Sequence, residues 1–166
     1  MPARDIVIVP HPTLRKKAVK VTDFGPDLQN LVDDMIITLH ENFGAGLAAP
    51  QVNVSQQVIL VEYGSDEDEN IPSTLYVTIN PKITRFSNNL AIGAEGCLSI
   101  PGLMGEIERA EGITVEGLDR FGKPLKMRLN GWVSRIFQHE IDHLNGILFT
   151  DLTTEVWETD EDYNPV

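Results

Sequence analysis

Two histidines near the C-terminus of the chain are spaced as metal ligands on a helix. His139 and His143 stand four residues apart in the segment His139-Glu140-Ile141-Asp142-His143. Residues four apart in an α-helix lie about 40° apart around its axis, so both imidazoles project to one side, as a shared metal ion requires. Glu140 lies about 100° round from His139, beside the metal position. The segment therefore indicates a divalent-metal site with an unligated carboxylate alongside it.

The helix expected to carry these residues runs from about Gly131 to Leu144, and Asn145-Gly146 supplies its C-terminal stop. One half of its helical wheel combines the two histidines and Glu140 with apolar residues, namely Trp132, Val133, Ile136, Phe137 and Leu144. The other half holds Ser134, Arg135, Gln138 and Asp142, with Ile141 at its margin. Burying two imidazoles and a carboxylate is costly unless a cation compensates them. Hydrogen-bonded core histidines are the alternative at this point.

The metallohydrolase families that share this pattern differ in the residue that supplies the third metal ligand. A metzincin-type enzyme continues the pattern to a third histidine, but Phe149 holds that position. A thermolysin-like enzyme uses a downstream glutamate, and the candidates lie in a short acidic tail: Glu155, Glu158 and Glu161. The remaining soft ligand is Cys97, the one cysteine of the chain, although a lone cysteine is most often a small buried hydrophobe.

Three segments of the chain resemble the motifs of the bacterial and organellar peptide deformylases. They are Gly44-Ala45-Gly46-Leu47-Ala48-Ala49-Pro50-Gln51, Glu95-Gly96-Cys97-Leu98-Ser99 and Gln138-His139-Glu140-Ile141-Asp142-His143-Leu144, in the order of the family. The resemblance extends from Pro12 to Phe149. It implies a metallo-amidohydrolase that removes the formyl group from formyl-methionyl nascent polypeptides and releases formate.

The resemblance also implies a role for each residue of the metal site. Cys97, His139 and His143 would bind one divalent metal ion, with water in the fourth position, as in catalytic rather than structural sites. Metal-bound hydroxide would attack the formyl carbon, with Glu140 as general base and then general acid. The resemblance implies Fe²⁺ as the metal in the cell, with Zn²⁺ or Ni²⁺ as substitutes.

Further residues would meet the substrate. By the same resemblance, Gln51 and the backbone N–H of Leu98 would hold the developing oxyanion. Gly46, Ala45 and Glu95 are expected at the substrate-binding surface. Trp132 and Ile136 are candidates for lining the methionine pocket, and core packing is an equally open interpretation for both.

The chain departs from the family pattern at one position. Many members carry an arginine five residues after the motif serine, where this sequence has Met104, so we expect this position to affect substrate affinity or selectivity. Arg109 is present, and we expect Glu95 and Arg109 to form a buried pair that braces the cysteine loop.

The elements around the motifs favour an α+β fold of mainly antiparallel β-sheets packed around a central metal-binding helix, with an N-terminal helix. The apolar spacing predicts that first helix over residues 26–43. Strands are predicted over residues 58–63, 75–79 (stopped by Asn80-Pro81), 113–118 and 125–129, the last two joined by a turn at 119–124. We expect one catalytic domain over residues 1–154 and an acidic tail over 155–166.

Charge and hydropathy restrict the partners. The net charge is −12, and the acidic residues gather at 66–69 and 155–162, expected to be a solvated loop and a loose terminus. This distribution argues against direct nucleic-acid binding, although transient proximity to the ribosome is compatible with the substrate. No apolar run suits a membrane helix and no signal-peptide pattern is visible. We therefore expect a cytoplasmic, bacterial-type protein, or an organellar one if a transit peptide is missing from this sequence.

Three other interpretations share these residues. Cys97 could be the nucleophile of a metal-free thiol hydrolase, with a histidine as its base. A different zinc peptidase would take its third ligand from the acidic tail. A non-catalytic module would keep the fold and the metal without using Glu140.

Overall fold

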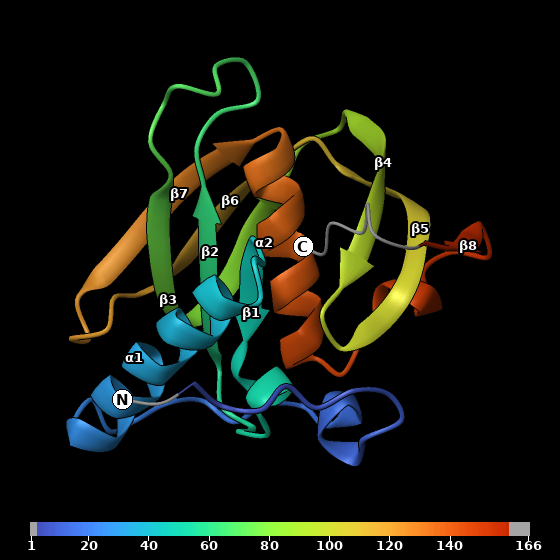
Figure 1. Cartoon of the computed structure of the whole chain (residues 1–166). Helices are drawn as coiled ribbons and strands as arrows, with labels where there is room; N and C mark the ends of the chain where they lie inside the picture. Colours follow the sequence, from blue (N-terminus) through green and yellow to red (C-terminus); the bar gives the residue numbers. More distant parts are fainter. Residues whose placement is uncertain (1–2, 160–166) are drawn as a thin grey trace.

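The computed structural model describes residues 3–159 of the chain. Two antiparallel sheets lie on either side of the helix α2 (Trp132–Leu144), as Figure 1 shows. The five-stranded sheet has the order β1-β2-β3-β6-β7, formed by Gly46–Ala48, Val58–Tyr63, Thr74–Phe86, Gly112–Leu118 and Pro124–Asn130. The three-stranded sheet has the order β4-β5-β8, formed by Leu90–Cys97, Ile100–Ala110 and Val156–Glu158. The predicted α+β class with a central helix is confirmed.

The helix α1 (Pro26–Glu41) packs on the face of the large sheet that points away from α2. Its apolar residues recur every three or four positions and bury one side against β1 and β2, namely Leu28, Leu31, Val32, Met35 and Leu39. The prediction that this helix reaches residue 43 is wrong by two residues. Phe43 has a φ of +55°, which a right-handed helix does not accommodate, and Gly44 N–H donates to Leu39 O to close the end.

Strand β3 continues through the point where its end was predicted. Asn80-Pro81 does not stop it, because the pairing register with β6 shifts between Ile79 and Lys82 and takes up the irregular residues in a bulge. Asn80 adopts a φ of +52°. Its side chain accepts from Val21 N–H and donates to Val21 O, which ties the bulge to the N-terminal segment.

Several elements were not predicted as strands, namely β1, β4, β5 and β8. Strand β1 is three residues long and lies within the glycine-rich motif, which has no alternating pattern. Part of the expected acidic tail is also ordered, since β8 pairs with β5 at Leu103–Gly105. The rest of that tail, residues 160–166, lies outside the described residues, and the domain boundary at 154 stays a prediction.

The helix α2 is buried on both halves of its wheel. The half expected to be polar contains Ser134, Arg135 and Gln138, which are all buried, because the β4–β5 hairpin packs on that side while the large sheet packs on the other (Figure 1). No helix within residues 3–159 is long and apolar enough to cross a membrane.

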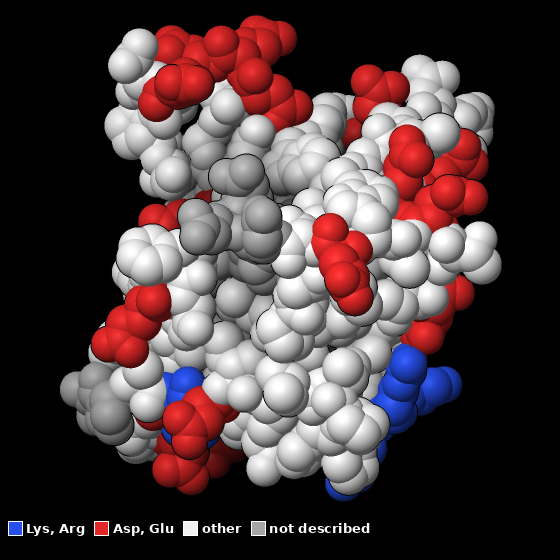
Figure 2. Space-filling view, turned by 45° about the vertical axis from the view of Figure 1, so that its right-hand side comes forward, with Lys and Arg blue, Asp and Glu red and all other residues white. Residues whose placement is uncertain are grey.

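The acidic loop between β2 and β3 is only partly the solvated segment that was expected. Figure 2 shows the acidic side chains gathered over this loop. Asp66, however, accepts hydrogen bonds from the Tyr63 hydroxyl and from Trp132 N–H at the start of α2. Asp66 therefore caps the N-terminus of α2.

Candidate metal centre and active site

The two histidines of α2 face the same side, as their spacing predicts. Their ring centroids are 5.1 Å apart, and His139 and His143 are exposed by only 2% and 1%. Helical geometry alone brings the rings together, since residues four apart lie one above the other on a helix face.

Cys97 lies on the three-stranded sheet and places its sulfur beside these rings. It is the last residue of β4, just before the turn into β5, and its Sγ lies 3.3 Å from His143 Nε2. One ligand atom from each of Cys97, His139 and His143 lies within 4.8 Å of the others. The three residues therefore share one centre, and no tail glutamate within the described part of the chain joins that group.

Buried polar atoms around this centre lack partners. His139 Nε2 and both oxygens of Glu140 are buried without a hydrogen bond from residues 3–159. Burial raises the pKa of the Cys97 thiol and of the Glu140 carboxyl, and it lowers the pKa of His143 well below its usual value. A cation at the centre would give the lone pair of His139 Nε2 a partner and could be held by the sulfur and both rings. The residues present therefore fit a divalent metal ion.

Glu95 lies behind His139 and orients its ring. Glu95 Oε1 is 2.8 Å from His139 Nδ1, so that Nδ1–H donates to the carboxylate and Nε2 keeps its lone pair for the centre. Burial acts to raise the pKa of Glu95, but hydrogen bonds from His139 and Arg109 outweigh it and hold that pKa below its usual value. The carboxylate is therefore ionised at neutral pH.

The expected pair of Glu95 and Arg109 is confirmed. Arg109 donates to both carboxylate oxygens, at 2.6 and 2.9 Å, and also reaches Asp142 at 2.8 Å. Arg135 adds a third cationic contact to Glu95, at 2.7 Å. Glu95 is 0% exposed. Its expected place at the substrate-binding surface is therefore corrected, because protein partners occupy its carboxylate and close it off from a ligand.

Gln51 is fixed beside the ligand sulfur. Its Oε1 accepts from Ala48 N–H at 3.0 Å, and its Nε2 donates to Ser99 Oγ at 3.2 Å and lies 3.6 Å from Cys97 Sγ. The side chain is fully buried. Leu98 follows Cys97 directly, so its backbone N–H stands at the same turn.

Gly46 lies against the carboxylate of Glu140. A Cβ added at Gly46 would stand 2.4 Å from Glu140 Oε2 and 2.8 Å from Ile136 Cγ2. The absence of a side chain therefore leaves the space that Glu140 occupies. Ala45 immediately precedes β1, and its O accepts from Glu62 N–H.

The two candidates for the methionine pocket lie at different depths. Ile136 is fully buried in the core cluster between α2 and the large sheet and adjoins Gly46. Trp132 is half-buried at the first residue of α2, with the Arg135 guanidinium 5.5 Å from its ring centroid. Ile136 and Glu140 both border the position of Gly46.

Comparison with known proteins agrees with the family that the sequence motifs resemble. The family model described as polypeptide deformylase matches residues 3–157. The chain belongs to the peptide deformylase family. A peptide deformylase of Halothermothrix orenii is 43% identical over 158 residues, covering 95% of this chain and 98% of its own. Two solved deformylases are similar in fold. That of Ehrlichia chaffeensis has a TM-score of 0.86 and 37% identity, and the match covers 92% of this chain and 88% of that one. That of Acinetobacter baumannii with Met-Ala-Ser bound has a TM-score of 0.84 and 36% identity, and the match covers 91% of this chain and 98% of that one.

The enzyme is therefore a metal-dependent hydrolase that removes N-terminal formyl groups from polypeptides. Sequence reasoning missed one residue of its site. Arg135 stood on the half of the helix expected to be polar, yet it is buried and donates to Glu95, Ile107 O and Ala91 O. Its position one turn before the ligand His139, on the same helix, is the signal that would have identified it.

Proposed function

We propose that Cys97, His139 and His143 hold one divalent metal ion and that Glu140 moves the proton during deformylation of formyl-methionyl peptides. One observation carries the proposal. The three ligand atoms lie within 4.8 Å of one another, and the carboxylate of Glu140, fully buried, has no hydrogen-bond partner in the described residues. A carboxylate kept unpaired at such a centre is available for proton transfer.

The ligand set suits more than one ion. A thiolate with two imidazoles favours zinc or ferrous iron, and affinity alone does not select between them in a cell. The resemblance to the family favours Fe²⁺, with Zn²⁺ or Ni²⁺ as substitutes. When bound, such an ion would supply Lewis acidity and lower the pKa of a coordinated water toward neutrality.

Glu140 would carry the proton in both halves of the reaction. Its carboxylate accepts a proton from the attacking water while the water oxygen bonds to the formyl carbon. It then donates that proton to the amide nitrogen as the carbon–nitrogen bond breaks. The products are formate and a peptide with a free N-terminal amino group. Burial raises the pKa of Glu140, which favours its retaining the proton between the two steps.

Gln51 and Leu98 would stabilise the charge that develops on the formyl oxygen. Ala48 and Ser99 hold the Gln51 amide beside the ligand sulfur, so its Nε2 would only have to exchange its contact with Ser99 Oγ or Cys97 Sγ for one with the formyl oxygen. The backbone N–H of Leu98 would be the second donor. Preorganised donors of this kind typically contribute about 10²–10³ in rate each.

The substrate backbone would approach β1 at Ala45 and Gly46. Strand β1 is at the edge of the large sheet, and Gly46 adjoins Glu140. A related deformylase from Acinetobacter baumannii binds Met-Ala-Ser, which supports a peptide that begins with methionine. Ile136 would border the methionine side chain beside Gly46, and Trp132 would meet the peptide further from the metal. We propose cytoplasmic nascent chains as the source of substrate.

The competing interpretations are less well supported. Cys97 is fully buried and burial raises the pKa of its thiol, so without a metal it would be a poor nucleophile. Glu155 and Glu158 are exposed and stand outside the ligand group, whereas Glu161 lies outside the described residues.

The experiment is turnover of formyl-Met-Ala-Ser by protein purified without oxygen and of measured metal content. Glu140→Gln should retain one metal per chain and lose about 10²-fold or more in kcat. Cys97→Ser should lose the metal, and the exposed Glu108→Gln should change neither quantity. Full turnover by metal-free protein would overturn the proposal in favour of the thiol hydrolase.

A further inference from the structure

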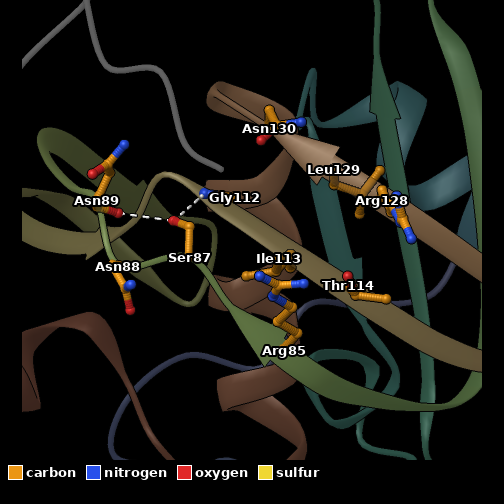
Figure 3. A pocket seen from close by; sticks show the side chains of 10 residues that line it. All are labelled: Arg85, Ser87, Asn88, Asn89, Gly112, Ile113, Thr114, Arg128, Leu129 and Asn130. Atoms are coloured by element: carbon orange, nitrogen blue, oxygen red, sulfur yellow. Dashed lines mark hydrogen bonds between the residues drawn. The ribbon is translucent and has the colours of Figure 1, made fainter.

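A polar groove lies at the end of β3, β6 and β7, away from the metal centre. Its volume is about 400 Å³. Figure 3 shows Arg85 and Arg128 in it on either side of Thr114. Asn88, Asn89 and Asn130 also line it. All of these side chains can donate hydrogen bonds, and no acidic side chain lines the groove.

The strand register places the two arginines on one face. Arg85 pairs with Thr114 across β3 and β6, and Thr114 pairs with Arg128 across β6 and β7. Neighbouring strands are about 4.8 Å apart, so the Cα atoms of the two arginines are separated by roughly 10 Å. The residues next to Thr114, Ile113 and Val115, pack in the core with α2. Thr114 and both arginines therefore face away from the catalytic helix.

These arginines differ from the others of the chain. Each of the others makes an ion pair with a carboxylate: Arg4 with Asp34, Arg15 with Asp151, Arg109 with Glu95, Arg120 with Asp33 and Arg135 with Glu95. Arg85 and Arg128 make none with residues 3–159. In a chain of net charge −12, two unpaired guanidinium groups in one groove are conspicuous.

The neighbouring row on the same face adds to the positive charge. Lys82 pairs with Glu116 across β3 and β6, and Glu116 pairs with Lys126 across β6 and β7. The two rows together hold four cationic side chains and one carboxylate. The net charge of these two rows is therefore positive, opposite in sign to that of the whole chain.

Hydrogen bonds of the Ser87 side chain hold the turn that closes the groove. Figure 3 shows the Ser87 hydroxyl accepting from Gly112 N–H and donating to Asn89 O, at 3.0 and 2.9 Å. The side-chain amides of Asn88, Asn89 and Asn130 have no hydrogen-bond partner within residues 3–159. Gly112 leaves room for one of them, since a Cβ there would stand 2.4 Å from Asn130 Oδ1.

We propose that this groove binds a ligand with adjacent phosphate groups, such as a free oligophosphate. The guanidinium fork donates to two oxygens at once and matches phosphate geometry. Two forks on either side of Thr114 suit two oxyanion groups better than one. The free amides would donate to the remaining oxygens. Because the net charge of the chain repels anions at long range, binding would depend on this site and not on general attraction.

Calorimetric titration of the metal-loaded enzyme with inorganic pyrophosphate tests the proposal, in a buffer without phosphate. The wild type should bind one pyrophosphate per chain. Arg85→Gln and Arg128→Gln should each weaken binding by about tenfold, since a charge-assisted contact contributes about 1.4 kcal/mol or more. The matched control Lys16→Gln with Lys17→Gln removes two charges from an exposed segment outside the groove and should leave affinity unchanged. All variants should keep wild-type deformylation, because neither arginine is near the metal centre.

Two outcomes overturn the proposal: no saturable binding to the wild type, or equal weakening by the control and the arginine variants. A second titration with a short single-stranded RNA distinguishes the source of the phosphates. RNA that displaces bound pyrophosphate would place a polynucleotide backbone in the groove and contradict the expected lack of direct nucleic-acid binding. RNA that leaves pyrophosphate bound would assign the groove to a free oligophosphate.

Discussion

Glu95 receives a hydrogen bond from His139, with 2.8 Å between Oε1 and Nδ1, and thereby connects the metal centre to a buried charge network. Arg109 and Arg135 hold the same carboxylate. Glu95 comes from β4, Arg109 from β5, and His139 from α2. Because β4 carries both Glu95 and Cys97, the network connects the strand of the cysteine ligand to the helix of the histidine ligands.

Replacing Glu95 should weaken both the metal centre and the fold. Glu95→Gln leaves the buried Arg135 guanidinium without its carboxylate and Arg109 with Asp142 alone, and we expect a loss of about 3–5 kcal/mol in the free energy of unfolding. Loss of the negative charge behind a ligand histidine should lower metal affinity by roughly 10–100-fold. Urea unfolding and chelator competition measure the two effects.

The control for this variant is Glu108→Gln. Glu108 lies on β5 next to Arg109 but is exposed, so its replacement should change neither quantity. An unchanged metal affinity in Glu95→Gln would show that the charge of Glu95 does not contribute to metal binding.

Gly46→Ala should impair catalysis without removing the metal. The new Cβ would stand 2.4 Å from Glu140 Oε2, so the carboxylate must move. A displacement of about 1 Å at a catalytic group can cost roughly 10²-fold in rate. Steady-state kinetics together with metal analysis should show a fall in kcat at full metal content.

Gly44→Ala is the matched control in the same segment. Its Cβ would meet the ends of the Leu98 and Leu39 side chains at 3.0 and 3.1 Å, and flexible side-chain ends can shift. We expect kcat within a few-fold of the wild type for this variant. Equal losses in both variants would mean that the whole glycine segment had been distorted, and not Glu140 alone.

The ligand histidines could be predicted from sequence because their geometry is local. Four-residue spacing in a helix fixes the relation between His139 and His143 whatever the rest of the fold does. Cys97 is 42 residues away from His139 along the chain, as the numbering shows, so only the resemblance to a family assigned it. The buried pair of Glu95 with Arg109 followed from the motif in the same way, but the contacts of Glu95 with His139 and Arg135 did not.

The errors have a common physical cause, which is tertiary packing. Ser134, Arg135 and Gln138 look like a solvent-facing half of α2, and a second sheet buries them. The end predicted for β3 at Asn80-Pro81 is reasonable for a short sequence window, but hydrogen bonds to the distant Val21 stabilise a bulge there. Neither contact leaves a local pattern in the sequence.

Asp66 should stabilise the start of α2, unlike the other acids of its loop. Asp66→Ala removes the acceptor for Trp132 N–H and for the Tyr63 hydroxyl, and loss of such a cap typically costs about 0.5–2 kcal/mol. Burial and the hydrogen bond to Asp66 raise the pKa of Tyr63 to about 12, so the variant should lower it. Urea unfolding and an absorbance titration of the phenol measure these changes.

The comparison variant is Glu67→Ala, in the same exposed loop. Its side chain should contribute less than about 0.5 kcal/mol, and the Tyr63 titration should stay as in the wild type. If both variants were equally destabilised, the cause would be the loss of loop charge and not the contact with α2.

Asp151 should contribute stability that depends on pH. The Arg15 guanidinium holds it through two contacts, at 2.5 and 3.1 Å, and this hydrogen bonding keeps the pKa of Asp151 below its usual value of 3.8. A carboxyl with a lowered folded-state pKa stabilises the protein fully above the unfolded value. That contribution is lost as the pH falls through the folded-state pKa.

Asp151→Asn should therefore be less stable than the wild type at pH 7, and the difference should shrink as the pH falls below about 3.8. Since the side chains of Arg15 and Asp151 are 52% and 38% exposed, the difference at pH 7 should not exceed about 1 kcal/mol and should decrease with added salt. Urea unfolding of both proteins at pH 7 and pH 3 measures it, with the exposed Glu155→Gln as the control. A difference that is independent of pH would assign the effect of Asp151 to its contact with Leu148 N–H, which an asparagine oxygen replaces only in part.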